Sequence, residues 1–158
     1  MKCFFYYSNS YFAYAYLASA MHMGILPNQP PFPSDSIKQL QPCTHGKRKP
    51  LYAGKDSCGN NIYAVWNVGA PEMVMKMISS FLQAYDIPQA SVVFSNLGIK
   101  DDLLSLTTNL MVKYGNGQLY TWLVKTILAR HYPQIALAVG RSCHHNLTKT
   151  ASYQIMLP

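Results

Sequence analysis

Small polar residues or glycine, and in one case an arginine, follow four of the apolar runs in this sequence, and they are the first candidates for chemistry. These candidates are Ser8, Asn9, Ser10, Asn67, Gly69, Ser95, Asn96 and Arg141. Hydroxyl, amide and backbone N–H donors around one guanidinium suit a phosphate or carboxylate. Turns between strands and helices use Ser, Asn and Gly in any case, so the pattern alone does not require a ligand.

Each candidate has an expected role if the four turns share one edge of a sheet. Asn9 and Ser10 would donate hydrogen bonds, Asn67 and Asn96 would orient the ligand, and Arg141 would pair with its charge. His22 lies on the first predicted helix and is the candidate general acid or base.

The elements that must position these residues alternate between strand and helix. Apolar runs predict strands at residues 2–7, 51–55, 62–67, 91–94 and 135–139, with a hairpin at 56–60. Helical patterns cover residues 13–23, 70–85, 101–113 and 118–131. This order predicts an α/β fold: a three-layer sandwich with a mixed, mostly parallel sheet of about five strands, arranged as in Rossmann-like proteins. Ligands of such sheets bind at the carboxyl ends of the strands.

One domain is expected over residues 1–158. Residues 27–50 would form a Pro-rich and basic loop insertion, and residues 140–158 a C-terminal tail. The chain has 158 residues, of which 49% are hydrophobic, which excludes a disordered tail. No apolar run is long enough to span a membrane.

Charge is scarce but unbalanced, with 13 Lys and Arg against 6 Asp and Glu and a net charge of +7. So few acids disfavour carboxylate-driven catalysis. The only dense basic run, Lys47-Arg48-Lys49, supports an alternative function as a protein or nucleic-acid interaction module. The remaining basic residues are scattered, so nucleic acid is the less favoured partner. Ser8-Asn9-Ser10 interrupts the apolar core that a signal peptide needs, which favours a cytoplasmic protein.

The four cysteines are too few for a disulfide scaffold. Two clusters offer zinc-type ligands as an alternative site: Cys43 and His45, and Cys143 with His144 and His145. A Cys/His nucleophile pair drawn from the same residues is also open. Neither cluster has Cys-x-x-Cys spacing, and surface histidines explain the same pattern. No glycine-rich phosphate motif is present.

Three segments resemble an uncharacterised family, a domain of unknown function of spore-forming Gram-positive bacteria. They are Tyr6-Tyr7 with Met21–Pro27, Gly54-Lys55-Asp56 with the hairpin that follows, and Thr108–Lys113. The resemblance would extend to about Val139 and supports the α/β fold. The family's first loop typically carries glycines and a His-Ser-Ser, whereas the matching residues 10–15 here lack both the glycines and the histidine. If the family is enzymatic, this departure implies a lost or changed activity.

The expected function is therefore binding of an anionic or nucleotide-like small molecule at the carboxyl ends of the strands, in a divergent or inactive enzyme or a binding protein. Whether a reaction is catalysed, which cofactor is used and the oligomeric state stay open at this point.

Overall fold

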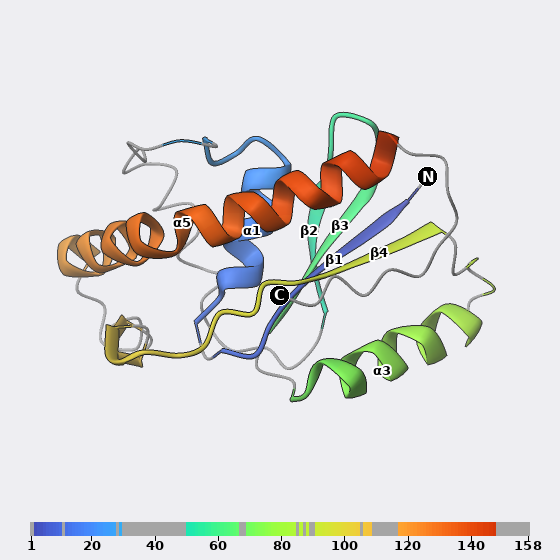
Figure 1. Ribbon diagram of the computed structural model, residues 1–158, viewed down its shortest axis with the longest axis horizontal. Helices are drawn as coiled ribbons and strands as arrows, with labels where there is room; N and C mark the ends of the chain where they lie inside the picture. Colours follow the sequence, from blue (N-terminus) through green and yellow to red (C-terminus); the bar gives the residue numbers. More distant parts are fainter. Residues whose placement is uncertain are drawn as a thin grey trace.

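Three parallel strands form most of the sheet in the structure, a computed structural model (Figure 1). It describes residues 2–10, 12–27, 29, 50–66, 69–84, 86, 88, 91–104, 106–108 and 117–147. The strands are β1 (Cys3–Ser8), β2 (Leu51–Lys55), β3 (Asn61–Trp66) and β4 (Val92–Asn96), in the order β2-β3-β1-β4. β3, β1 and β4 are parallel, and β2 pairs antiparallel with β3.

The composition of β1 fits its central place. All six of its residues are buried, as expected for a strand that is covered on both faces. Alternate side chains of β1 point to opposite faces of the sheet. Phe4 and Tyr6 belong to the apolar cluster on one face, and Phe5 and Tyr7 to the cluster on the other.

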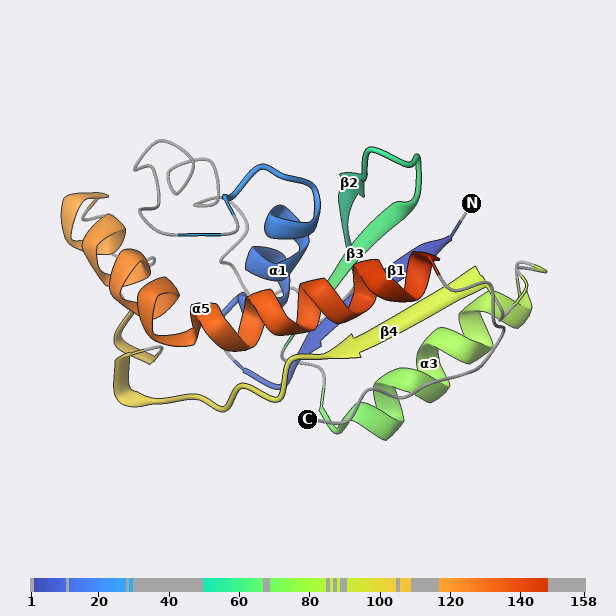
Figure 2. The ribbon, with the colours of Figure 1, turned by 45° about the horizontal axis from the view of Figure 1, so that its top comes forward.

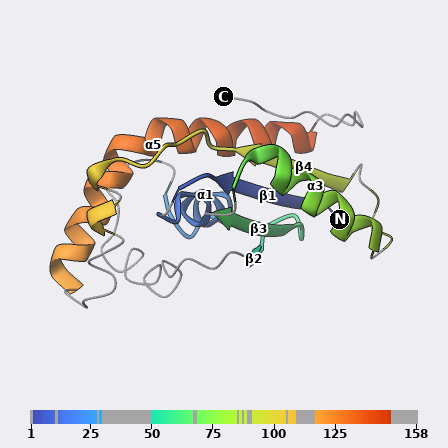
Figure 3. The same cartoon turned by 90° about the horizontal axis from the view of Figure 1, so that it is seen from below.

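Helices cover both faces of the sheet (Figure 3). α1 (Tyr14–His22) and α5 (Gly117–Leu147) pack on the face that holds Phe4 and Tyr6, and α3 (Pro71–Ala84) packs on the other. α3 buries Val74, Ile78 and Leu82, which recur every four residues and so form one stripe along the helix.

The hairpin between β2 and β3 is held by Asp56. Its Oδ1 accepts hydrogen bonds from the backbone N–H groups of Cys58 at 2.9 Å and Asn60 at 2.8 Å. Gly59 takes φ +79°, a conformation that favours glycine. The predicted hairpin at 56–60 is confirmed.

The predicted fifth strand is wrong, and the sheet has four strands. Residues 135–139 lie inside α5, which continues through Gly140 and Arg141 to Leu147. The predicted tail from residue 140 is therefore wrong as far as Leu147. A short apolar run does not distinguish a strand from a buried helical segment, and this run is rich in the helix formers Ala and Leu.

Pro133 comes shortly before this run, and a proline usually ends or kinks a helix. Here the helix continues through Pro133. Figure 2 shows α5 bending along its length, which is how a helix accommodates an internal proline.

Six other predicted elements agree with the sequence patterns. The strands at 2–7, 51–55, 62–67 and 91–94 and the helices at 13–23 and 70–85 are confirmed to within a few residues. The mixed α/β class is likewise confirmed. Of the Pro-rich segment 27–50, only residues 27, 29 and 50 are described. No helix in the described ranges is long and apolar enough to cross a membrane.

Candidate functional site

The connections of β1 and β3 leave the sheet on opposite faces. α1 follows β1 on one face, and α3 follows β3 on the other (Figure 3). Neighbouring parallel strands whose connections diverge in this way form a topological switch point, where α/β proteins bind ligands. Ser8 and Trp66 are the last residues of β1 and β3 and pair in register at this point.

Ser8 and Trp66 are both fully buried on the sheet face covered by α1 and α5. Neither Ser8 Oγ nor Trp66 Nε1 has a hydrogen-bond partner among the described residues. A buried donor without an acceptor costs about 1–3 kcal/mol. Two such donors at one switch point indicate an acceptor that the described chain does not supply.

Sequence reasoning included Ser8 but missed Trp66. Tryptophan in a strand reads as core packing, and nothing in the pattern marks its N–H as unpaired. The available signal was its place at the last position of a buried strand.

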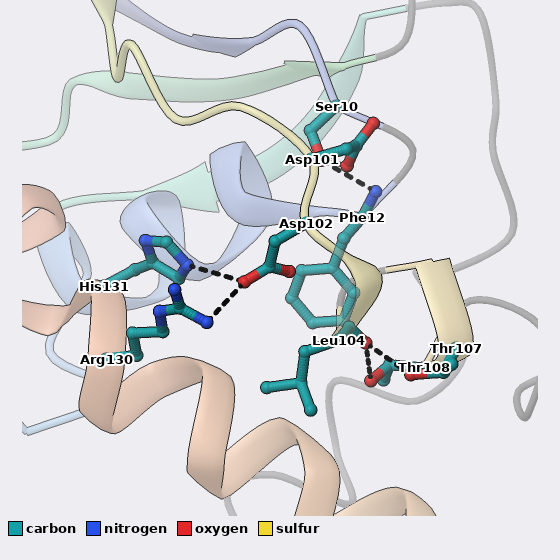
Figure 4. A network of polar contacts seen from close by, with 9 residues as sticks. All are labelled: Ser10, Phe12, Asp101, Asp102, Leu104, Thr107, Thr108, Arg130 and His131. Carbon is teal, nitrogen blue, oxygen red and sulfur yellow. Dashed lines mark hydrogen bonds and ion pairs between the residues drawn. The ribbon is translucent and has the colours of Figure 1, made fainter.

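Ser10 joins the loop after β1 to the segment after β4 (Figure 4). Its Oγ donates a hydrogen bond to Asp101 Oδ1 and accepts one from the backbone N–H of Phe12 at 3.0 Å. The hydroxyl that was expected to donate to a ligand is thus held by a carboxylate of the chain itself, directly before α1.

Asp102, the next residue, contacts α5 (Figure 4). Its Oδ2 lies 2.9 Å from Arg130 Nη1 and 3.8 Å from His131 Nε2. The side chain of Arg130 is 63% exposed, whereas that of His131 is 16% exposed. The ring of His131 packs edge-on against Tyr14 at the start of α1, with centroids 5.2 Å apart.

The pKa of His131 lies below its ordinary value of 6.5. Burial is the largest cause and the Arg130 charge adds to it, while Asp102 acts in the opposite direction. His131 is therefore a neutral imidazole at pH 7, able to accept a proton. The sequence interpretation placed it near the end of a helix, but it lies well inside α5.

Two of the remaining predicted residues have hydrogen-bond partners within the chain. Asn96 Oδ1 accepts a hydrogen bond from the backbone N–H of Gly98 at 3.0 Å, and the Gly69 carbonyl accepts one from the Tyr7 hydroxyl. Ser95 is buried and Asn9 is exposed. Asn67 lies outside the described residues.

Arg141 does not follow a strand, so the reasoning that placed it at the carboxyl edge is wrong. It is an exposed residue of α5. The end of α5 that carries it lies beside the amino end of β1 (Figure 2). Arg130 is the arginine that the fold brings to the carboxyl edge.

His22 also lies at the amino edge, away from Ser8 and Ser10. It is the last residue of α1, which starts at the carboxyl edge and runs back along the sheet. Its Nδ1 lies 2.7 Å from the Tyr6 hydroxyl and its Nε2 3.5 Å from Asp56 Oδ2. A carboxylate can only accept, so Nε2 carries the ring proton and Nδ1 accepts from Tyr6.

The surroundings keep this cluster in one protonation state. Burial lowers the pKa of His22, although Asp56 opposes it, and burial strongly raises the pKa of Tyr6. Burial alone would raise the pKa of Asp56, but hydrogen bonds from Asn60 and Cys58 hold it below 3.8. The side chains of His22 and Asp56 are 4% and 6% exposed. Such a network supports the fold and offers little access to a substrate.

Most of the residues proposed as alternative zinc ligands lie outside the part of the chain that the structure describes. Cys43, His45 and the side chains of His144 and His145 lie outside the described residues, and Cys143 is a half-buried residue of α5. Within the described part of the chain, no three His, Cys, Asp or Glu residues group closely enough to hold a metal ion. Burial raises the pKa of the Cys143 thiol, with Asp56 and Cys58 adding to the shift, so it is a poor nucleophile at pH 7. The basic run Lys47-Arg48-Lys49 also lies outside the described residues.

Comparison with known proteins places this chain in a family without assigning it a reaction. No curated protein and no solved structure matches it. One family matches residues 3–142, which span every described strand and helix except the last residues of α5. The chain therefore belongs to the family described as "Protein of unknown function (DUF3189)".

Proposed function

We propose that this protein binds an anionic or nucleotide-like small molecule at the carboxyl ends of β1 and β3. The observation that carries the proposal is the pair of buried donors, Ser8 Oγ and Trp66 Nε1, that pair in register and lack acceptors among the described residues. Both groups can donate, and tryptophan can only donate, so the group they recognise must be an acceptor.

The charges at this edge are consistent with an acceptor that is also an anion. Arg130 supplies a guanidinium and His131 a neutral imidazole, and both belong to α5 beside the segment after β4. A phosphate or carboxylate oxygen accepts from a hydroxyl, an indole N–H and a guanidinium alike.

Finer expectations accompany the proposal. The parallel order β3-β1-β4, with helices on both faces, supports a Rossmann-like way of holding the ligand. Two expectations from the sequence remain part of the proposal: that the protein is cytoplasmic, and that it comes from a spore-forming Gram-positive bacterium. The divergent first loop supports a binding protein or a changed enzyme.

A thermal-shift panel with inorganic phosphate, AMP, ADP, ATP and a sugar phosphate tests the proposal, with calorimetry for any hit. A ligand that binds the folded state alone raises the melting temperature by mass action. Ser8→Ala and Trp66→Phe each remove one donor and should weaken the hit about tenfold, which corresponds to about 1.4 kcal/mol.

Two matched controls separate loss of a donor from general damage. Ser142→Ala removes another buried hydroxyl, one that donates to the Ala138 carbonyl at 2.9 Å and also contacts the Tyr6 hydroxyl at the amino edge, away from Ser8 and Trp66. Trp122→Phe changes an indole that is 59% exposed. The proposal fails if no probe shifts the melting temperature, or if the Ser8 and Trp66 variants bind as tightly as these controls.

A further inference from the structure

Asp101 stands where an α/β protein usually places its ligand's anion. The loop after β1 leads directly into α1, and a helix N-terminus attracts negative charge. Here Ser10, two residues after β1, donates its hydroxyl hydrogen to Asp101. Phe12 N–H in turn donates to Ser10 Oγ, so the carboxylate is linked through Ser10 to the entry of α1.

Asp102 holds the positive group of the same edge. Its Oδ2 accepts from Arg130 Nη1 at 2.9 Å and faces His131 Nε2 at 3.8 Å (Figure 4). The Asp102 carboxylate therefore binds the Arg130 guanidinium, which could otherwise pair with two oxygens of a phosphate.

The two carboxylates belong to adjacent residues of one irregular segment. Residues 97–102 follow β4 without helix or strand structure, and Asp101 and Asp102 end that stretch. A single shift of the segment would therefore release Ser10 and Arg130 together.

A separate observation indicates that a further acceptor group binds at the carboxyl edge of the sheet, in addition to these two carboxylates. Ser8 Oγ and Trp66 Nε1 are completely buried at the carboxyl ends of β1 and β3 and lack partners among the described residues. Neither Asp101 nor Asp102 forms a hydrogen bond with either of these two donors.

We infer that Asp101 and Asp102 hold the place of the ligand's anionic group, and that binding exchanges these carboxylates for a dianion of the phosphate monoester class. The inference rests on the proposed function and adds a ligand class and a mode of regulation to it. The chain's own carboxylates compete with the ligand and set its affinity.

Calorimetric titration with inorganic phosphate and with AMP tests the exchange on the full chain. Asp101→Asn and Asp102→Asn keep the size of each side chain but remove its charge. Each should bind both probes about fivefold more tightly than the unmodified protein, since the ion pair of Asp102 is worth up to about 1 kcal/mol and the hydrogen bond from Ser10 to Asp101 about as much. Arg130→Gln should weaken binding by a similar factor, and in the Arg130→Gln background Asp102→Asn should bring no gain.

Two control variants separate this effect from net charge. Asp86→Asn removes one negative charge away from the site, and asparagine tolerates the positive φ of 53° at this position. Arg141→Gln removes another exposed arginine of α5, about three turns beyond Arg130 and at the amino edge of the sheet. Neither should change the affinity for phosphate or AMP more than about twofold.

The possible results distinguish failure of the carboxylate exchange from failure of the proposed ligand binding. If the unmodified protein binds a probe but Asp101→Asn and Asp102→Asn bind it no more tightly, the exchange is wrong and the proposed function stands. If Asp86→Asn gains as much, the effect is one of net charge and the exchange is again wrong. If no form of the protein binds, both proposals fail. Circular dichroism checks the fold of each variant, and Asp101→Ser, which keeps a hydroxyl beside Ser10, replaces Asp101→Asn if that variant is unfolded.

Discussion

The face of the sheet under α1 and α5 carries two histidine–aspartate pairs, one at each edge, that differ in how fully their side chains are bonded and buried. At the amino edge, His22 has a partner on each ring nitrogen, and Asp56 accepts from Asn60 and Cys58 as well. At the carboxyl edge, His131 approaches Asp102 only at 3.8 Å, and the second partner of Asp102 is a largely exposed arginine.

The difference shows what each pair can do. A fully bonded, buried network is costly to break and gains little from changing protonation state, so it stabilises the fold. A loosely paired histidine beside an exposed guanidinium loses little when a partner is exchanged, which is what the proposed ligand binding requires of this edge. Four predictions follow the contrast from the largest expected effect to the smallest.

His22→Ala should cost about 3 kcal/mol of unfolding free energy, measured by urea denaturation. It removes a ring that packs against Phe4 and Tyr6 and takes one partner away from each of two buried groups, the Tyr6 hydroxyl and Asp56. His131→Ala is the matched change at the other edge and should cost about 1 kcal/mol, because its ring is more exposed and less fully bonded. Equal losses in the two variants would contradict the division of roles.

Tyr6→Phe should cost about 1.5 kcal/mol, because it leaves His22 Nδ1 without its 2.7 Å hydrogen bond while keeping the aromatic ring. Tyr52→Phe is the control, since Tyr52 is 50% exposed and should lose less than about 0.5 kcal/mol. Chemical denaturation of the two variants side by side measures both values. A Tyr6→Phe protein as stable as the control would mean that the hydroxyl contributes nothing at the amino edge.

Acid should destabilise the protein in the window just below pH 6.5. The pKa of His22 is depressed in the folded protein by burial, whereas in the unfolded chain it returns to about 6.5. Between these two pKa values the unfolded chain binds more protons, so the free energy of unfolding falls as the pH falls, by at most about 1.4 kcal/mol per pH unit for one proton. Above the unfolded value this contribution is constant.

Histidine variants show which edge of the sheet causes this pH dependence of the unfolding free energy. The pKa of His131 is lowered as well, so it adds to the effect with the same sign, whereas the lowered pKa of Asp56 acts only below about 3.8. His22→Gln should flatten the profile of unfolding free energy against pH, and His131→Gln should do so less. A profile that keeps its full slope in His22→Gln would show that the amino-edge histidine is not the group that titrates.

Most elements could be predicted from the sequence, because their patterns were local. The aromatic run of β1, the proline at the first turn of α3 and the hairpin at Asp56–Asn60 each carry a signal within a few residues. The run 135–139 carried two conflicting signals, an apolar stretch after a proline and helix-forming composition, and the packing of α5 over the sheet decided between them.

The site was harder to predict because its residues meet only through the fold. Ser8 and Ser10 could be proposed from their place after a strand, but Trp66 looked like core, and Asp101 and Asp102 looked like the start of a helix. One misplaced strand moved the expected arginine from Arg130 to Arg141, a residue at the opposite edge of the sheet. The direction of α1 had the same effect on His22: a helix that returns along the sheet carries its last residue away from the site.

Arg130→Gln should change the free energy of unfolding by less than about 0.5 kcal/mol, the smallest effect of the four, because its side chain is 63% exposed and solvent screens its bond to Asp102. Urea denaturation in low salt and in about 1 M NaCl measures it, and the small difference should vanish in high salt, where the Debye length is about 3 Å. A loss above about 2 kcal/mol would mean that the carboxyl-edge pair supports the fold as the amino-edge pair does. With stability unchanged, any loss of phosphate affinity in this variant reports on the ligand alone, because the guanidinium would then contribute to binding without being needed for folding.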